Sequence, residues 1–85
     1  MEFIFSTHAR EQMHERKIIQ QIIIQIINQP DEIVTQSDLQ VFQGLIKENG
    51  KSYLIRIFVN VALHPNLIIT VYKTSKISKY YEGEI

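Results

Sequence analysis

Hydrophobic residues recur along the chain with two different periods, and the change between them separates a helical first part from a strand-rich second part. Residues 18–29 read "IIQQIIIQIINQ", a mixture of isoleucine with glutamine and asparagine at helical spacing. One half of the helical wheel holds Ile18, Ile19, Ile22, Ile23, Ile26 and Ile27. Only Ile24 falls on the polar half, and Pro30 ends the helix. Because isoleucine is a mediocre helix former, packing has to hold this helix in place.

The residues before this helix predict two further elements. A short edge strand is expected over Glu2–Phe5. Ser6 and Thr7 are both good N-cap residues, and they stand just ahead of a helix expected over His8–Arg16. Ala9 and Met13 lie on the inward face of that helix. The helix is expected to end near Lys17, before the isoleucine helix begins.

After Pro30 the hydrophobic period becomes two, which predicts four strands. The expected strands are Glu32–Gln36, Gln40–Ile46, Ser52–Val59 and Leu67–Lys73. Asn49-Gly50 predicts a two-residue type I′ hairpin, because both central residues of that turn need positive φ. The tail "TSKISKYY" is compatible with a helical turn or an edge strand. We therefore expect a single α+β domain over residues 1–85, with two N-terminal helices packed on one face of an antiparallel sheet of three to four strands.

The hairpins also predict which side chains share a face of the sheet. Centring the first hairpin on Asn49-Gly50 places Gln43 opposite Arg56, and centring the second near Leu63 places Arg56 opposite Thr70. The expected core face holds Phe42, Ile46, Tyr53, Ile55, Ile57, Val59, Leu67, Ile69 and Val71. The opposite face holds Val41, Gln43, Leu45, Leu54, Arg56, Phe58, Ile68, Thr70 and Tyr72. An arginine in the middle of the central strand is costly unless it is paired or reaches solvent.

Composition narrows the classes of function. The chain is 45% hydrophobic and has no cysteine, which excludes disulfides, thiolate zinc sites and a cysteine nucleophile, and fits a cytoplasmic protein. The start lacks a signal-peptide pattern, and no apolar run is long enough to span a membrane, so we expect no membrane association. The net charge is zero, yet residues 49–81 contain five basic and no acidic side chains. This asymmetry predicts an anionic ligand bound at one place.

The histidines and glycines do not predict a metal or a cofactor. His8 and His14 are six residues apart, about 240° around a helix, so they cannot share a metal from one helical face. His64 lies in a turn beside Pro65. There is no phosphate-binding glycine loop, nucleophile elbow or dinucleotide motif, and the chain has only three glycines.

What remains is a set of residues suited to phosphate. Arg56 offers a planar fork of donors, and the hydroxyls of Thr70 and Tyr72 share its face. Lys73, Lys76 and Lys79 recur every three residues in the segment that also holds Tyr72, Tyr80 and Tyr81, a combination that suits single-stranded RNA. His8 exchanges protons near neutral pH. Such a set can cleave RNA without a metal: a base activates the 2′-hydroxyl, cations stabilise the phosphorane, and an acid protonates the leaving oxygen.

Each of these residues also has a structural explanation. Arg56 could be the ion-pair partner of a glutamate in the first helix, and Thr70 is a normal strand former. The tyrosines are often packing residues, and the lysines often form a solvated surface. His8 could serve only in the cap region, while Arg10 and His14 form an exposed cationic stripe.

Several segments resemble one protein family. They are "FSTHAREQMHERKI", "NQPDEIV", "GKSYLIRI" and "ITVYKTSKISKYY". They are similar to the family called domain of unknown function 4258, whose pattern opens with Phe-(Ser/Thr)-x-His-Ala, has an Arg ending the first helix and closes with Thr-x-Tyr-x-(Thr/Ser)-x-Lys. Gln29-Pro30 replaces the commoner Asn-Pro at the helix stop. The resemblance implies a ribonuclease-toxin fold of the BrnT/RelE-like kind, whose members are typically toxins of type II toxin–antitoxin pairs that cut mRNA and are silenced by a cognate antitoxin.

These observations lead to one main hypothesis and two alternatives. We expect a metal-independent endoribonuclease toxin with RNA and a cognate antitoxin as partners, in a complex that can be oligomeric. The expected catalytic residues are His8, Arg56, Lys76 and Tyr80, and the expected RNA-binding residues are Arg10, Thr70, Tyr72, Lys73 and Lys79. The first alternative is a non-catalytic module that binds RNA or protein with the same basic face. The second is a purely structural domain in which Arg56 is ion-paired.

Overall fold

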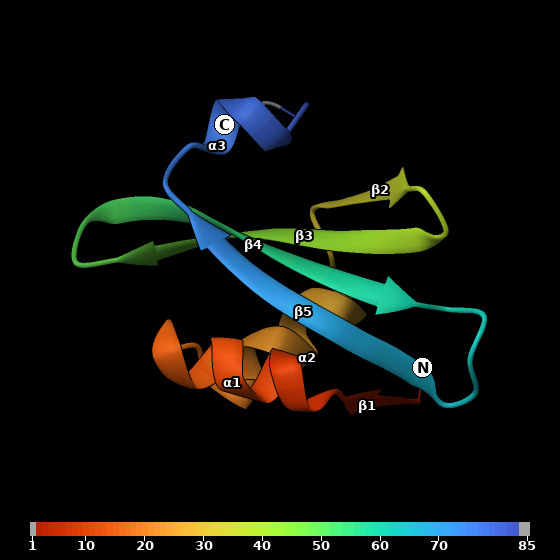
Figure 1. Cartoon of the computed structure of the whole chain (residues 1–85). Helices are drawn as coiled ribbons and strands as arrows, with labels where there is room; N and C mark the ends of the chain where they lie inside the picture. The colour runs from red at the N-terminus through yellow and green to blue at the C-terminus, as the bar shows by residue number, and fades with distance from the viewer. Residues whose placement is uncertain (1, 84–85) are drawn as a thin grey trace.

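Residues 2–83, which the computed structural model describes, form a five-stranded sheet with helices on both faces (Figure 1). The elements in chain order are β1 (Phe3–Phe5), α1 (Thr7–Glu15), α2 (Gln20–Asn28), β2 (Glu32–Gln36), β3 (Leu39–Glu48), β4 (Lys51–Asn60), β5 (Asn66–Thr74) and α3 (Ile77–Tyr80). Helices α1 and α2 lie on one side of the sheet and α3 on the other (Figure 1). The α+β class and the two N-terminal helices on one face are as expected, and the tail forms a short helix.

The sheet is mixed, which corrects the prediction of three to four antiparallel strands. Its order is β1-β5-β4-β3-β2, and the β1–β5 pair is parallel while the other three pairs are antiparallel. Phe3 of β1 pairs with Asn66, and Phe5 pairs with Ile68. This pairing joins segments about sixty residues apart, so the local period of hydrophobic residues carries no information about it.

Helix α1 begins at Thr7, one residue before the predicted start at His8, and Ser6 is its N-cap residue. The Ser6 hydroxyl accepts a hydrogen bond from the Ala9 amide at 3.0 Å, and it also donates to the Ile69 carbonyl at 2.8 Å. The first bond caps the helix, and the second fixes its first turn against β5. Ala9 is fully buried, and Lys17, with φ of 56°, turns the chain between α1 and α2.

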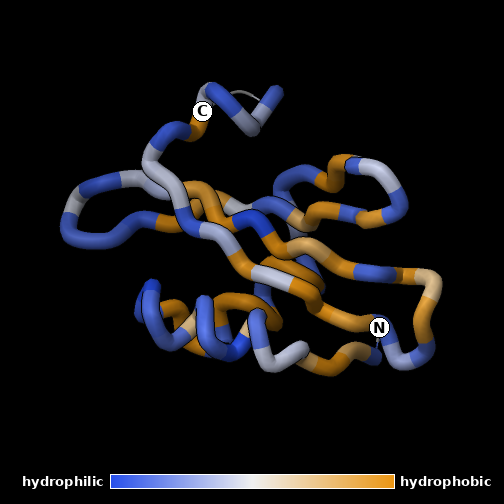
Figure 2. Tube along the Cα trace, in the orientation of Figure 1, coloured by the Kyte–Doolittle hydropathy of each residue, from blue (hydrophilic) through white to orange (hydrophobic). Residues whose placement is uncertain are grey.

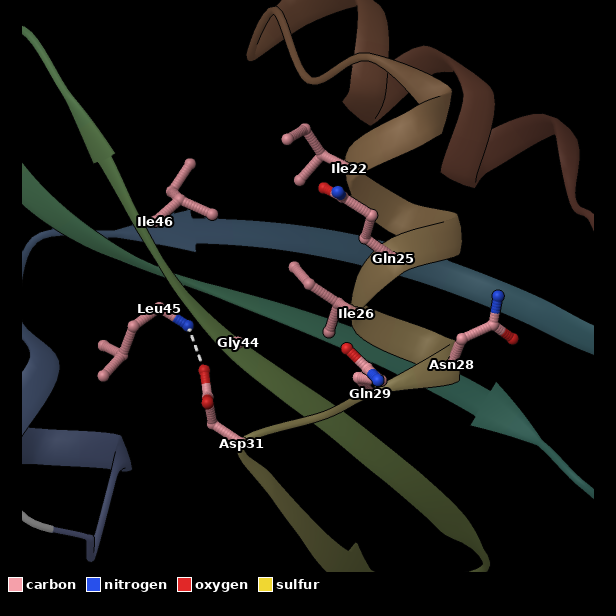
Figure 3. Close-up of a pocket in the computed structure, with 9 residues that line it drawn as sticks. All are labelled: Ile22, Gln25, Ile26, Asn28, Gln29, Asp31, Gly44, Leu45 and Ile46. Carbon is pink, nitrogen blue, oxygen red and sulfur yellow. Dashed lines mark hydrogen bonds between the residues drawn. The ribbon is translucent and has the colours of Figure 1, made fainter.

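Helix α2 packs through its isoleucines, as its pattern predicts, with one exception. Ile19 was expected to face inward, but it is 60% exposed. The reason is that α2 begins only at Gln20, so Ile19 is its extended N-cap residue and does not follow the helical wheel. Farther along the helix, Ile26 points at Gly44 of β3 (Figure 3). A Cβ on Gly44 would lie 2.6 Å from Ile26 Cγ1, so glycine is what lets α2 approach β3 this closely.

The first hairpin has the predicted register and the second does not. Asn49 and Gly50 both have positive φ, and Gln43 pairs with Arg56. The expected pairing of Arg56 with Thr70 is wrong, because Arg56 pairs with Tyr72. The shift is two residues, so Thr70 and Tyr72 keep the face that they share with Arg56.

An irregularity near the second turn changes the face of the residues before Thr70. The β4–β5 register shifts between Phe58 and Val59, so that Val59 pairs with Ile68 while Phe58 pairs with Thr70. The extra residue in β5 is Ile69, as in a β-bulge. Ile68 is therefore buried in the core beside Val59, whereas the sequence analysis placed Ile69 on that face.

The two faces of the sheet differ in what covers them. The face under α1 and α2 carries the main hydrophobic core, whose buried residues are Ala9, Ile18, Ile23, Ile26, Ile27, Phe42, Ile55, Ile57, Val59, Ile68 and Val71. Hydrophobic positions follow the central strands and α2, whereas the β3–β4 turn is hydrophilic (Figure 2). On the opposite face, α3 covers part of the sheet through Ile77, and Val41 and Leu54 are fully buried there. No helix within residues 2–83 has the length and apolar character that crossing a membrane requires.

Candidate functional site

A cleft of about 450 Å³ lies between α1 and α3, over strands β4 and β5. Helix α1 lines it with His8, Gln12 and Arg16. The strands and α3 line it with Arg56, Phe58, Thr70, Val71, Tyr72 and Tyr80. Strand alternation brings Arg56, Thr70 and Tyr72 to the same face, and α3 then brings Tyr80 over them. The cleft thus collects five of the nine residues that the sequence predicted for the site.

Arg56 lies in this cleft, and no carboxylate of the described residues forms an ion pair with it. Only 8% of the residue is exposed, and its Nε donates a hydrogen bond of 2.6 Å to Oε1 of Gln43, a neutral side chain. Within residues 2–83 the one ion pair joins Lys73 to Glu48, so the expected pairing of Arg56 with a glutamate of the first helix is not formed. Burial lowers the pKa of Arg56 from its ordinary value, although an arginine remains protonated at neutral pH.

Aromatic rings hold this guanidinium in place. Its Cζ lies 4.4 Å from the centre of the Tyr80 ring and 5.1 Å from that of Phe58. Such cation–π contacts partly replace the water that a buried cation loses. Arg16 lies in the same way over Tyr72, at 5.0 Å, and the rings of Tyr72 and Tyr80 meet edge to face. Each of these two tyrosine rings therefore contacts an arginine of the protein itself.

The hydroxyl of Tyr80, which lines the cleft, has a lowered pKa. A hydrogen bond with Lys79 is the largest cause, and the charge of Lys79, a hydrogen bond with Tyr72 and the charge of Arg56 act in the same direction. Together they lower the pKa of Tyr80 from its ordinary value of 10.0. The lowered pKa means that this hydroxyl loses its proton more easily than a free tyrosine does.

Helix α1 forms one rim of the cleft with residues spaced four apart. His8, Gln12 and Arg16 lie on one stripe of the helix, and both His8 and Arg16 are exposed. Gln12 Oε1 accepts a hydrogen bond of 3.0 Å from Arg16 Nε, and Arg16 Nη1 donates to the Lys73 carbonyl at 3.4 Å. The second bond anchors this rim to β5. The rim therefore places an imidazole and a second guanidinium beside Arg56.

Four predicted site residues do not line the cleft. Arg10 lies over the ring of Phe5, at 5.2 Å. Lys73 pairs with Glu48 on the other face of the sheet, since it alternates with Tyr72 along β5. Lys76 is exposed at the start of α3, and Lys79 is exposed with its ammonium 5.3 Å from the Tyr80 ring centre. Lys79 thus acts on the cleft only through Tyr80.

The sequence analysis also missed residues that the structure brings to the site. Gln12 and Arg16 line the cleft, and the four-residue spacing from His8 was the signal that could have found them. Gln43 was placed opposite Arg56 by the hairpin register but was not selected as a site residue. It is fully buried and is the hydrogen-bond acceptor for Arg56.

A larger groove, of about 520 Å³, lies between α2 and β3 (Figure 3). Its polar lining consists of the amides Gln25, Asn28 and Gln29 and the carboxylate of Asp31. Asp31 Oδ2 already accepts a hydrogen bond of 2.8 Å from the Leu45 amide. Because this groove holds no cationic side chain and no histidine, it is a poorer candidate for acid–base or phosphate chemistry than the cleft.

The cleft therefore combines buried and exposed guanidinium groups, an imidazole and hydroxyls. Guanidinium groups can bind an anion, and the imidazole and hydroxyls can transfer a proton. Across residues 2–83 the structure brings together no group of three or more histidine, aspartate or glutamate side chains suited to a metal ion.

Comparison with known proteins places the chain in one family. The model of the family described as Domain of unknown function (DUF4258) matches residues 5–73, which include α1, the whole β2–β4 region and nearly all of β5. No curated protein and no solved structure matches the chain. Since the match covers most of the sequence, including Arg56 and the α1 rim, the chain belongs to the DUF4258 family.

Proposed function

We propose that this protein is a metal-independent endoribonuclease that cleaves mRNA, acting as the toxin of a type II toxin–antitoxin pair with a RelE/BrnT-like fold. The observation that carries the proposal is Arg56: a nearly buried guanidinium in a cleft, without a carboxylate partner among the described residues. Burying an unpaired charge is costly, so a protein that does so at a cleft gains most when an anion occupies it. The phosphodiester of RNA is such an anion, and it matches the guanidinium fork.

The proposed reaction follows from where the cleft holds its groups. A base takes the proton from the 2′-hydroxyl, the 2′-oxygen attacks the phosphorus, and an acid protonates the leaving 5′-oxygen, which yields a 2′,3′-cyclic phosphate. Arg56 and Arg16 stabilise the negative charge that develops on the phosphorane oxygens. His8 and Tyr80 are the proton-transfer groups, and Thr70 and Tyr72 position the phosphate. Arg16 takes the role that the sequence analysis gave to Lys76, which lies outside the cleft.

The alternative function is a non-catalytic module that binds RNA or protein through the same cleft. One observation favours it: His8 is exposed at the rim, whereas general acid–base catalysts are commonly held by neighbouring groups. Salt-dependent binding of single-stranded RNA without cleavage would support this alternative.

The decisive experiment compares two arginine variants in RNA cleavage. Purified wild-type protein is expected to cut single-stranded RNA in EDTA and leave 2′,3′-cyclic phosphate ends. Arg56→Ala is expected to lower the cleavage rate by about 100-fold or more, the scale reached when a donor to a developing oxyanion is removed. Arg10→Ala is the matched control, because Arg10 is an exposed arginine outside the cleft, and it should cleave like the wild type.

Two outcomes would contradict the proposal. Cleavage by Arg56→Ala at the wild-type rate would show that Arg56 takes no part in the mechanism. Absence of cleavage by the folded wild type would contradict the endoribonuclease proposal and favour the non-catalytic binding module. In a bacterial host, induced expression should arrest growth, with rescue by the product of the neighbouring open reading frame.

A further inference from the structure

Gln43 is a fully buried amide at the centre of a hydrogen-bond network on the cleft side of the sheet. Its Nε2 donates to Glu32 Oε1 at 2.9 Å and to the Tyr80 carbonyl at 3.2 Å, while its Oε1 accepts from Arg56 Nε at 2.6 Å. The carboxylate of Glu32 and the carbonyl of Tyr80 are both hydrogen-bond acceptors, so the NH2 group of Gln43 has to face them. This fixes the orientation of the amide. The oxygen of Gln43 is thereby directed at Arg56.

This arrangement controls two properties of Arg56. Because Gln43 binds Nε, the guanidinium cannot rotate freely, and its two Nη groups are left for the cleft. Because Gln43 is neutral, it orients the guanidinium without cancelling its charge. Glu32, the carboxylate of the network, contacts Gln43 and the Glu82 amide, so the amide of Gln43 stands between it and Arg56.

We propose that Gln43 is the positioning residue of the cleft, holding Arg56 by Nε and keeping its positive charge available so that the Nη groups bind a phosphate. The inference rests on the proposed function, since it takes the cleft to receive the phosphate of RNA. It adds that phosphate binding requires residue 43 to be neutral as well as hydrogen-bonded to Arg56. A carboxylate at this position would form the ion pair that the cleft avoids, and would compete with a bound anion.

A charge swap tests this directly. The double variant Gln43→Glu/Glu32→Gln has the same net charge as the wild type and nearly the same side-chain shapes, but it moves the carboxylate onto Arg56. Titration with inorganic phosphate, followed by NMR of the Arg56 guanidinium, is expected to show at least about tenfold weaker binding than in the wild type. Glu32→Gln alone is the control, and it should bind phosphate no more weakly than the wild type.

A measurement on the wild type keeps the inference testable if the double variant does not fold. Added phosphate should shift the Nη resonances of Arg56, while the Nε–H resonance should stay in place and remain protected from exchange, because Gln43 still holds it. A shift or loss of protection at Nε would show that phosphate displaces Gln43, and would overturn the inference.

The remaining outcomes separate the two claims. A charge-swapped variant that binds phosphate like the wild type would overturn the role of Gln43 alone. The role of Gln43 would also be overturned if Glu32→Gln alone weakened phosphate binding as much as the double variant does. Loss of the hydrogen-bond network, and not the charge at residue 43, would then explain the weaker binding. A folded wild type that neither binds phosphate nor cleaves RNA would overturn the proposed function together with this inference.

Discussion

At the scale of single residues, the cleft holds a buried cation that pairs with no carboxylate among residues 2–83. Arg56 is held by one neutral hydrogen bond and by two aromatic rings. The sequence could predict that Arg56 and Gln43 face each other, because the Asn49-Gly50 turn fixes their register. It could not predict that Tyr80 lies over the guanidinium, since that contact depends on how the tail folds back across the sheet.

Tyr80 offers a prediction at the same scale. Lys79 is the largest cause of its lowered pKa, and a positive neighbour favours the phenolate. Removing the ammonium with Lys79→Ala should therefore raise the pKa of Tyr80 toward its ordinary value of 10.0, measured by NMR titration of the ring signals. Lys76→Ala is the matched control, because Lys76 is an exposed lysine of the same segment, and it should leave the titration unchanged. Equal effects of the two substitutions would show that the overall positive charge of the segment lowers the pKa of Tyr80, and not a specific contact with Lys79.

At the scale of elements, period and turn chemistry predicted most of the secondary structure. Both helices, the four strands after Pro30 and the first hairpin follow from local pattern, with bounds within a few residues. Two of the failures, the parallel β1–β5 pair and the register shift beside Val59, concern how strands pair, which the hydrophobic period of a single strand does not determine. Ile19 failed for a local reason, because a residue at the helix boundary does not follow the helical wheel.

The contact between α2 and β3 gives a prediction about stability. Gly44→Ala places a Cβ against Ile26 and should lower the free energy of unfolding by about 1–3 kcal/mol, measured by urea denaturation. Ile26→Ala removes the opposing atoms, so the double variant should lose less stability than the two single variants added together.

Gly50→Ala is the control for this cycle. Gly50 has a φ of 79° and no atom near its missing Cβ, so alanine there should cost about 1 kcal/mol through backbone strain alone. Its effect should add to that of Ile26→Ala without coupling. Additive behaviour of Gly44→Ala and Ile26→Ala would contradict the close approach of α2 and β3.

At the scale of the whole molecule, one sheet connects every described element. Helices α1 and α2 pack on one face and α3 on the other, and β1 is paired to β5 (Figure 1). The shared face of Arg56, Thr70 and Tyr72 could be predicted from the sequence, because it follows from strand alternation. The sequence analysis misjudged the lysines, because alternation places Lys73 on the far face and the α3 turn carries Lys76 away from the cleft.

This connectivity predicts cooperative unfolding. Far-UV circular dichroism reports the sheet and helices, and tyrosine fluorescence reports the four tyrosines, of which Tyr72 and Tyr80 meet at the cleft. The two urea transitions should coincide, as they do for small two-state domains. An earlier transition in fluorescence would show that α3 separates from the sheet before the rest unfolds.

The cleft takes its two rims from opposite ends of the chain, with His8 on α1 and Tyr80 on α3. Ribosomes release a protein from its amino end, so the imidazole emerges long before the ring that will lie over the guanidinium. Until the tail has emerged and β5 has met β1, the growing polypeptide has no assembled pocket. Synthesis itself thus sets the earliest moment at which the assembled cleft can exist.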